Sequence, residues 1–271
     1  MLIEGKVAIV TGAASGIGRA TAEMLAQKGV KGIGLVDMSE SVEELAREIN
    51  EANPGNPARA FIGDTTSSEF RKSVFNSMRD SFGAVGILVP AAGITRDAIA
   101  VKMNRESGEA SIYPEEKFRL VTEVNLVAPI YWSLELVAQQ AEERAERGLN
   151  KWDPEEGMQG AVVFIGSVAS QGNKGQVAYA SAKAGLEGAT ATLSKEAIFH
   201  GVRCGIIHPG FTDTPMVRAM GEEKVKEYIL PYTEIQRLVR PDEIADAICF
   251  MISNSAVSGA LWADAGWHPH P

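Results

Sequence analysis

The chain has 271 residues, 45% apolar and 23% charged, which is enough for one large α/β domain and short for two independent enzymatic domains. Lys and Arg total 26 against 35 Asp and Glu, so the formal net charge is −9 and we expect neither nucleic acid nor a membrane as a partner. Cys204 and Cys249 stand far apart in apolar runs, a pattern typical of buried thiols in a reducing compartment rather than of disulfides. We find neither a signal peptide nor an apolar run long enough to span a bilayer, and we predict a cytoplasmic protein.

The histidines do not indicate a metal centre. His200, His208, His268 and His270 lack metal-ligand spacing on a shared element, and the last two stand in a Pro-rich tail. We therefore predict no metal site.

Short apolar runs alternate with helix-compatible segments along the chain. The strands expected are Lys6–Thr11, Gly32–Val36, Arg59–Ile62, Ile87–Val89, Val162–Ile165, Val202–Ile207 and Leu261–Ala263. The helices expected are Gly16–Lys28, Ser41–Asn50, Ser68–Phe82, Pro114–Arg147, Tyr179–His200 and Pro241–Ser253. Such alternation predicts parallel strands with crossover helices, and nearly continuous apolar strands indicate burial on both faces. We predict one α/β domain, residues 1–271, built on a doubly wound parallel sheet of about seven strands with helices on both faces.

Two stretches look inserted between these elements. One is the polar run 104–111, and the other is the run 142–160, which contains Trp152. Surface elaboration is the simplest interpretation of each.

A glycine-rich turn follows the first strand. Thr11-Gly12-Ala13-Ala14-Ser15-Gly16-Ile17-Gly18 departs from the G-x-G-x-x-G form, but glycines here let a pyrophosphate approach a helix N-terminus in the same way. Glycines also serve plain strand-to-helix turns, so the motif alone is weak.

Acidic residues end the second and third strands. Asp37 is placed to accept hydrogen bonds from both ribose hydroxyls of an adenosine and to repel a 2′-phosphate, which favours NAD over NADP. A strand-end aspartate that caps a turn is the alternative. Asp64 could reach an adenine amino group, although Asp-Thr-Thr is an equally good turn sequence.

Tyr179 and Lys183 stand four residues apart, so they share a helix face and bring an ammonium group near a phenol. The phenol has an ordinary pKa near ~10, and a neighbouring cation stabilises its phenolate. Tyr179 is therefore a candidate general base in alcohol oxidation and general acid in carbonyl reduction. Ser167, twelve residues earlier at the end of the fifth strand, could hydrogen-bond the substrate oxygen.

Together these residues resemble the classical short-chain dehydrogenases/reductases over Lys6 to Trp267, which implies a Rossmann-type fold. The resemblance implies that Ser167, Tyr179 and Lys183 are catalytic and that Asn125 is the fourth catalytic residue, holding a water that links the lysine to solvent. On spacing alone, Asn125 would be a helix-interior residue with a local hydrogen bond. Pro90-Ala91-Ala92-Gly93 resembles the fourth-strand motif of the family, with Pro90 in place of the usual asparagine.

The resemblance also implies the residues that bind the cofactor. Pro209-Gly210 with Thr212 and Thr214 is similar to the segment that cups the nicotinamide carboxamide. The full set expected to contact NAD(H) is Gly12, Ser15, Gly16, Ile17, Gly18, Asp37, Asp64, Thr65, Ala91, Ala92, Gly93, Tyr179, Lys183, Pro209, Gly210, Thr212 and Thr214. One departure concerns the substrate loop, since the interval from Ser167 to Tyr179 is one residue shorter than in many members.

These observations leave three functional hypotheses. The first is an NAD-dependent oxidoreductase that interconverts a secondary alcohol and a ketone. Apolar residues between Phe211 and Leu230, such as Met216 and Met220, favour a hydrophobic alcohol or ketone, although the same spacing equally fits an amphipathic helix packed on the body. The second rests on the run 93–97, Gly-Ile-Thr-Arg-Asp, which is similar to a loop of the 3-oxoacyl carrier-protein reductases; it predicts a 3-oxoacyl-ACP or 3-hydroxyacyl-CoA substrate, with NADPH or NADH. Those enzymes usually carry a basic residue near the second strand for NADPH, and Asp37 opposes that cofactor here.

The third hypothesis is a nucleotide sensor on the same fold, which the presence of the whole catalytic set disfavours. The resemblance finally implies a homo-oligomer, commonly a tetramer built through the helices that carry Asn125 and Tyr179.

Overall fold

The computed structural model describes residues 1–55 and 57–267. A seven-stranded parallel sheet runs through its centre in the order β3-β2-β1-β4-β7-β8-β9. The strands are β1 Val7–Thr11, β2 Gly32–Asp37, β3 Ala58–Ile62, β4 Val85–Pro90, β7 Gly160–Ile165, β8 Val202–Pro209 and β9 Gly259–Ala263. The strand order reverses between β1 and β4, which is where open sheets of this kind bind ligands, outside the carboxyl ends of the strands.

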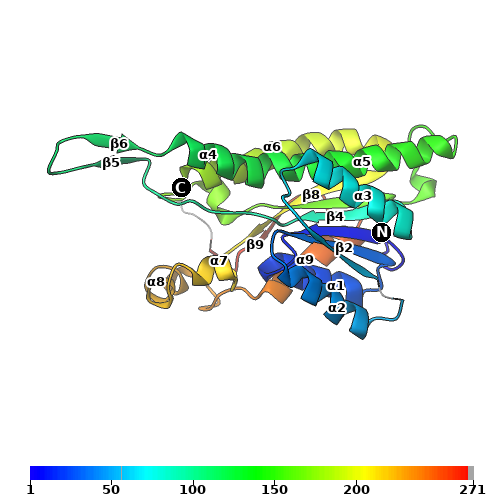
Figure 1. The fold of residues 1–271 in the computed structure, drawn as a ribbon, viewed down its shortest axis with the longest axis horizontal. Helices are drawn as coiled ribbons and strands as arrows, with labels where there is room; N and C mark the ends of the chain where they lie inside the picture. The colour runs from blue at the N-terminus through cyan, green and yellow to red at the C-terminus, as the bar shows by residue number, and fades with distance from the viewer. Residues whose placement is uncertain (56, 268–271) are drawn as a thin grey trace.

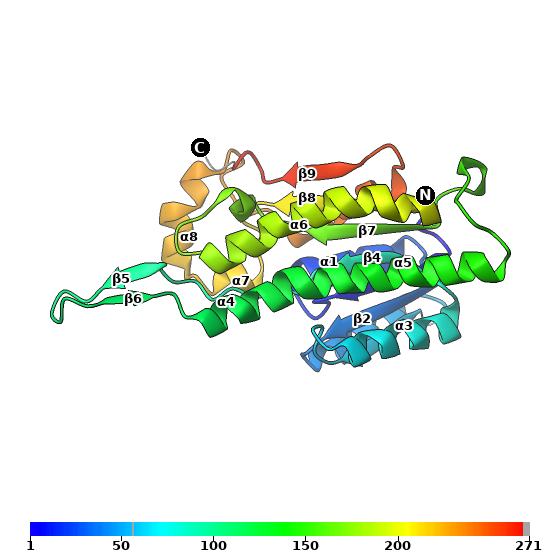
Figure 2. The ribbon, with the colours of Figure 1, turned by 90° about the horizontal axis from the view of Figure 1, so that it is seen from above.

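Helices cover both faces of the sheet (Figures 1 and 2). On one face lie α1 Gly16–Gln27, α2 Ser41–Ala52 and α9 Pro241–Ser253; on the other lie α3 Ser68–Phe82, α4 Glu115–Thr122, α5 Ala128–Glu146 and α6 Val177–Glu196. Successive residues of β1 point to opposite layers: Ala8 joins the core under α1 and α9, and Ile9 joins the core under α3 and α5. Because both faces are buried, the strand is apolar throughout.

The doubly wound parallel sheet predicted from the alternation of elements is therefore confirmed. Every predicted strand and helix is present with its ends slightly shifted, and the structure adds elements that the sequence did not predict. Between β8 and α9 the chain forms two short helices, α7 Pro215–Arg218 and α8 Glu222–Tyr228, followed by a 3₁₀ turn at Leu230–Tyr232. The sequence leaves two interpretations of this segment open, an apolar cover over the substrate and an amphipathic helix packed on the body.

The long helix expected over 114–147 is not uniform. A π-helical turn, Glu123–Val127, separates α4 from α5. The continuous stretch Glu115–Glu146 is long and apolar enough to cross a membrane by length and composition alone, a test that core helices of soluble proteins also pass. Trp132 and Leu136 of this stretch are fully buried against the sheet.

The two inserted stretches lie at opposite ends of this long helix (Figure 2). Residues 104–111 belong to a two-stranded antiparallel arm, β5 Val101–Met103 and β6 Ala110–Ile112, rather than to a loop without regular structure. The second stretch contains the 3₁₀ turn Pro154–Glu156. It also contacts the 3₁₀ turn Ala197–His200 that follows α6, because the backbone N–H of Trp152 donates to the Phe199 carbonyl at 2.8 Å. A further 3₁₀ turn, Val168–Gln171, follows β7.

Candidate active site

Two cavities meet at the carboxyl ends of the strands. The larger, of about 570 Å³, runs along the ends of β1, β2 and β4, and the smaller, of about 140 Å³, lies between the end of β7 and the segment after β8. The residues that line both are Ile17, Ile165, Tyr179, Thr214 and Met216. Tyr179 therefore stands at the junction of a long groove and a small chamber.

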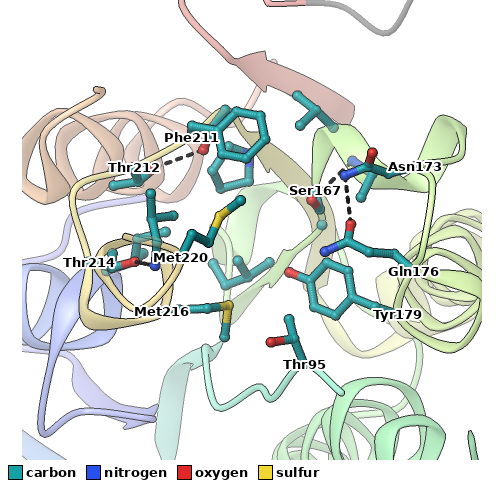
Figure 3. Close-up of a pocket in the computed structure, with 18 of the residues that line it drawn as sticks. Thr95, Ser167, Asn173, Gln176, Tyr179, Phe211, Thr212, Thr214, Met216 and Met220 are labelled. Carbon is teal, nitrogen blue, oxygen red and sulfur yellow. Dashed lines mark hydrogen bonds between the residues drawn. The ribbon is translucent and has the colours of Figure 1, made fainter. Parts of the chain in front are cut away.

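Ser167 and Tyr179 face the small chamber from one side, and Met216 and Met220 face it from the other (Figure 3). Burial raises the pKa of the Tyr179 phenol to about 12, while its hydrogen bond with Ser167 acts in the opposite direction. The Ser167 hydroxyl also accepts the Ala169 N–H at 3.1 Å, which fixes the serine at the start of the 3₁₀ turn after β7. In the protein alone, Tyr179 is thus protonated at neutral pH and can act as a proton donor.

Lys183 lies one helical turn after Tyr179, with its Nζ 5.5 Å from the centre of the tyrosine ring. The ammonium group donates to the Ile165 carbonyl at 2.8 Å, at the end of β7. Burial lowers the Lys183 pKa to about 8, because removal from water disfavours the charged form. The side chain remains mostly charged at neutral pH and can stabilise negative charge on the phenol oxygen.

Asn125 lies in the π-helical turn between α4 and α5 and is fully buried. A Cβ placed on Gly93 would lie 2.8 Å from Asn125 Oδ1 and 4.0 Å from Lys183 Nζ, so the asparagine and the lysine flank the same glycine. The side chain also donates to the Val121 carbonyl at 2.8 Å, one turn back in the helix. The local hydrogen bond expected from spacing alone is present, together with the proximity to Lys183 that the resemblance implies.

The glycine-rich turn closes one wall of the large cavity. Gly12 has a φ of 66°, and a Cβ there would lie 2.7 Å from the Ala92 nitrogen, so only glycine lets this turn pack against the end of β4. Helix α1 begins at Gly16, and Ser15, Gly16, Ile17 and Gly18 line the cavity beside it. The first turn of a helix offers N–H donors and a positive partial charge, which suits a pyrophosphate group.

Asp37 and Asp64 also line the large cavity. One Asp37 oxygen accepts the Ala14 N–H of the glycine turn at 3.0 Å, and the other accepts the Ser39 N–H at 3.0 Å. Asp64 accepts both the N–H and the hydroxyl of Thr66, at 2.9 and 2.8 Å. It therefore forms the turn that the Asp-Thr-Thr sequence predicts, and it also lines the cavity. Each carboxylate retains oxygen lone pairs for a ligand hydroxyl or amine.

The end of β4 is tied to β1 in spite of Pro90. Thr11 accepts the Ala91 N–H with its carbonyl at 3.2 Å and the Ala92 N–H with its hydroxyl at 3.1 Å. Thr11 thus anchors this strand end although Pro90 stands in place of the asparagine of the motif that it resembles. Ala91, Ala92 and Gly93 line the large cavity as expected.

The structure brings every residue predicted to contact the cofactor to one of the two cavities, with Thr65 in the large one and Pro209, Gly210 and Thr212 in the small one. Four further residues of the small chamber were not predicted as site residues. Thr95, Asp97, Asn173 and Gln176 form one wall of the small chamber; Gln176 donates to Asp97 at 2.8 Å, and Asn173 donates to Gln176 at 2.9 Å. Position just after Ser167, in the segment before Tyr179, was the available signal for the last two.

Cysteine and histidine do not form a metal centre in the described part of the chain, where no group of three His, Cys, Asp or Glu side chains could hold a metal ion. Cys204 and Cys249 are buried free thiols. His268 and His270 lie outside the described residues.

Comparison with known proteins decides the family. A model of the short chain dehydrogenase family matches residues 6–225. The chain belongs to the short-chain dehydrogenase family.

The relatives found for this short-chain dehydrogenase include reductases with the same name from several bacteria. It is 34% identical to the 3-oxoacyl-[acyl-carrier-protein] reductase FabG of Vibrio cholerae over 257 residues, 94% of this chain and 93% of that protein. It is 33% identical to the proteins of the same name from Escherichia coli K12 and Thermotoga maritima, over 94% of this chain and 93% and 94% of theirs. The protein is therefore an oxidoreductase of this family, and the family binds a nicotinamide cofactor.

The site of this short-chain dehydrogenase suits such a cofactor. The cavity of about 570 Å³ is lined by the N-terminus of α1, by the carboxylates of Asp37 and Asp64, and by Tyr179 and Lys183. When bound, the nicotinamide supplies or accepts the hydride; the protein supplies the proton and the groups that hold the reacting oxygen.

Proposed function

We propose that this enzyme reduces the 3-oxo group of an acyl thioester to a secondary alcohol, and catalyses the reverse oxidation, with NAD(H) as its preferred cofactor. The placement of Tyr179 at the junction of the two cavities carries the proposal, because it puts one proton donor beside both the cofactor groove and the substrate chamber. The relatives named above carry an activity of this kind in their names. A general ketone and secondary-alcohol specificity is the broader form of the same chemistry.

The geometry supports the following catalytic roles. In reduction, the carbonyl carbon gains a hydride and its oxygen gains the proton of the Tyr179 hydroxyl. The Ser167 hydroxyl, which lines the same chamber as Tyr179, donates to the same substrate oxygen as negative charge develops there. The Lys183 ammonium favours the phenolate that remains, and Asn125, on the other side of Gly93, is assigned the water that returns a proton to the lysine.

The small chamber supports a substrate with an apolar body and polar ends. Phe211, Met216, Val217 and Met220 provide its apolar side, and the Asn173 and Gln176 amides face them. Amide donors suit a thioester carbonyl, while the methionines adapt to acyl chains of different shape.

Asp37 supports NAD(H) over NADP(H). A carboxylate at the end of β2 accepts bonds from ribose hydroxyls and repels a 2′-phosphate, and the residues that follow it, Met38 and Ser39, carry no positive charge. A preference for NADPH remains the alternative, and the experiment below separates the two.

We also propose a single-domain, cytoplasmic enzyme that assembles as a homo-oligomer, with a tetramer as the expected state. The buried free thiols Cys204 and Cys249 support a reducing compartment. The net charge of −9 supports neither nucleic acid nor an anionic membrane as a partner. Light scattering of the purified protein at micromolar concentration measures the assembly, and a monomer would contradict it.

The function is tested by following nicotinamide absorbance with acetoacetyl-CoA, acetoacetyl carrier protein and a set of simple ketones, each with NADH and with NADPH. We expect turnover of the acetoacetyl thioesters, faster with NADH. Turnover of ketones but of neither thioester would reduce the proposal to a general alcohol dehydrogenase, and faster reaction with NADPH would overturn the cofactor assignment. Tyr179→Phe is expected to lose at least about 100-fold in kcat while calorimetry shows NADH binding unchanged.

A further inference from the structure

A buried histidine contacts the backbone of Ser167 from the neighbouring strand. His208 lies on β8 beside the end of β7, has 0% exposure, and stacks on Trp262 of β9 with ring centres 4.2 Å apart. A Cβ on Gly166 would lie 2.5 Å from His208 Nδ1, so the ring reaches this position only because residue 166 is glycine. The imidazole thus fills the space behind the serine that faces the substrate chamber.

One nitrogen of this ring meets both backbone polar groups of Ser167. His208 Nδ1 lies 3.2 Å from the Ser167 nitrogen and 3.1 Å from the Ser167 carbonyl oxygen. A single ring nitrogen serves one of them at a time: without a proton it accepts the Ser167 N–H, and with a proton it donates to the carbonyl. The location of the ring proton therefore decides how the serine backbone is held.

Glu187 favours one of the two states. His208 Nε2 lies 3.7 Å from Glu187 Oε1, and within residues 1–55 and 57–267 neither buried atom has a hydrogen-bond partner. Glu187 follows Lys183 by four residues on α6, so Tyr179, Lys183 and Glu187 occupy successive turns of one helix face. A carboxylate opposite Nε2 stabilises a proton on that nitrogen, which leaves Nδ1 free to accept the Ser167 N–H.

The charges around the ring keep it neutral at physiological pH. Burial lowers the His208 pKa, and Lys183 acts in the same direction, whereas the Ser167 backbone, Glu187 and Asp264 raise it. These groups come from α6, from the end of β7 and from the segment after β9, and Trp262 covers the ring face. The effect of burial on the His208 pKa is larger than that of Glu187 and Asp264, so the pKa is lowered overall.

We propose that His208 is a positioning residue for the reaction: its neutral ring, protonated on Nε2 opposite Glu187, accepts the Ser167 N–H and so keeps the Ser167 hydroxyl aimed at the substrate oxygen. The inference rests on the role proposed above for Ser167. Protonation of the ring turns Nδ1 into a donor, the Ser167 N–H loses its acceptor, and the backbone of the serine must shift. Acid therefore inactivates the enzyme through His208 in the direction of reduction, where the proton on Tyr179 is retained.

The kinetic test uses His208→Leu, His208→Asn and Glu187→Gln, assayed with NADH and the best substrate of the panel above. His208→Leu is expected to lose roughly 10- to 100-fold in kcat with little change in NADH binding, since the hydroxyl is misaligned while the cofactor groove is intact. His208→Asn places an amide oxygen near the position of Nδ1 and should restore most of the rate. Equal rates in the Leu variant and the wild type would overturn the proposal.

The pH profile separates positioning from simple packing. Glu187→Gln removes a carboxylate that favours the charged ring, so the acid limb of kcat should move to lower pH. His200→Asn, a histidine change in the 3₁₀ turn Ala197–His200 that follows α6, is the control and should leave the limb unmoved. An unmoved limb in Glu187→Gln contradicts the proposal, even if His208→Leu does not fold.

A spectroscopic test is independent of turnover and of the thioester assignment. Nitrogen NMR of ¹⁵N-histidine-labelled protein near pH 7.5, with His208→Asn to assign the ring, is expected to show a neutral His208 with its proton on Nε2. A proton on Nδ1 would overturn the inference. If the enzyme turns over none of the proposed thioesters, the proposed function fails while this readout still tests His208.

Discussion

Asn125 holds the backbone of Ile94 from both sides: its amide donates to the Ile94 carbonyl at 2.9 Å, and its Oδ1 accepts the Ile94 N–H at 3.2 Å. This pair joins the π-helical turn between α4 and α5 to the loop after β4, at the point where that loop lines the large cavity. Within its own helix the Asn125 amide also donates to the Val121 carbonyl at 2.8 Å, so one side chain bonds to both segments.

The first prediction concerns this junction. Asn125→Asp keeps the size of the side chain but removes the NH₂ donors to Ile94 and Val121, and it buries a carboxylate beside two carbonyl oxygens. We expect the free energy of unfolding to fall by about 2–4 kcal/mol and kcat to fall with it. Urea unfolding and steady-state kinetics measure both. Asn76→Asp on the exposed face of α3 is the control and should cost little.

The second prediction concerns the buried Lys183. Its pKa is lowered by burial to about 8, so the fold disfavours the ammonium relative to the unfolded chain. This cost is present below about pH 8 and disappears as the pH rises toward the ordinary lysine value. Lys183→Met should therefore be more stable than the wild type by about 1–3 kcal/mol at pH 7, with a smaller difference near pH 9.5, while turnover is lost.

Denaturant unfolding of the two proteins at both pH values measures this difference. A Lys183→Met variant that is less stable than the wild type at pH 7 would mean that the bond to the Ile165 carbonyl outweighs the desolvation of the ammonium. In that case the lysine would serve the fold as well as the reaction.

The third prediction concerns the choice of cofactor. Asp37→Ser removes the charge that repels a 2′-phosphate but keeps a short polar side chain at the end of β2. The ratio of kcat/KM for NADH over NADPH should fall by roughly 10- to 100-fold. Because Asp37 also accepts the Ala14 N–H, binding of both cofactors should weaken somewhat. Asp80→Ser, on the exposed face of α3, should leave the ratio unchanged.

The sheet could be predicted from sequence because its evidence is local. Each strand, such as β1 Val7–Thr11, is an apolar run buried on both faces, and each crossover helix begins and ends near turn residues. The candidate site followed because its residues stand at the carboxyl ends of strands, where parallel connections bring them together. Asp37, Ser167 and Tyr179 needed no knowledge of packing to be placed there.

Features that depend on contacts between distant segments could not be predicted. Glu123 to Val127 have ordinary helical composition, so the sequence does not mark their π turn, nor the pairing of Asn125 with Ile94, 31 residues earlier. The sequence does not predict the arm of β5 and β6, because each strand is three residues long, too short to show a period. Nothing in the sequence places His208 behind Ser167.

The last prediction concerns the second inserted stretch, which an ion pair fixes to the end of α5. Arg144, 1% exposed, forms two bonds with the Glu156 carboxylate, at 2.6 and 3.0 Å, and also donates to the Asn150 carbonyl. The Arg144 guanidinium and the Asp153 N–H lower the Glu156 pKa to about 2. A carboxyl with a lowered pKa contributes stability above its ordinary value, and that contribution is lost as the pH falls toward about 2.

Glu156→Gln should therefore be less stable than the wild type at neutral pH, and its stability should depend less on pH between about 4.5 and 2. Urea midpoints recorded across this range measure the slope. Glu155→Gln, one residue away and exposed, is the matched control and should follow the wild-type slope. If the two variants give the same slope, the ion pair does not hold the stretch 142–160 against the body, and its bonds to the Phe199 and Gly201 carbonyls are sufficient.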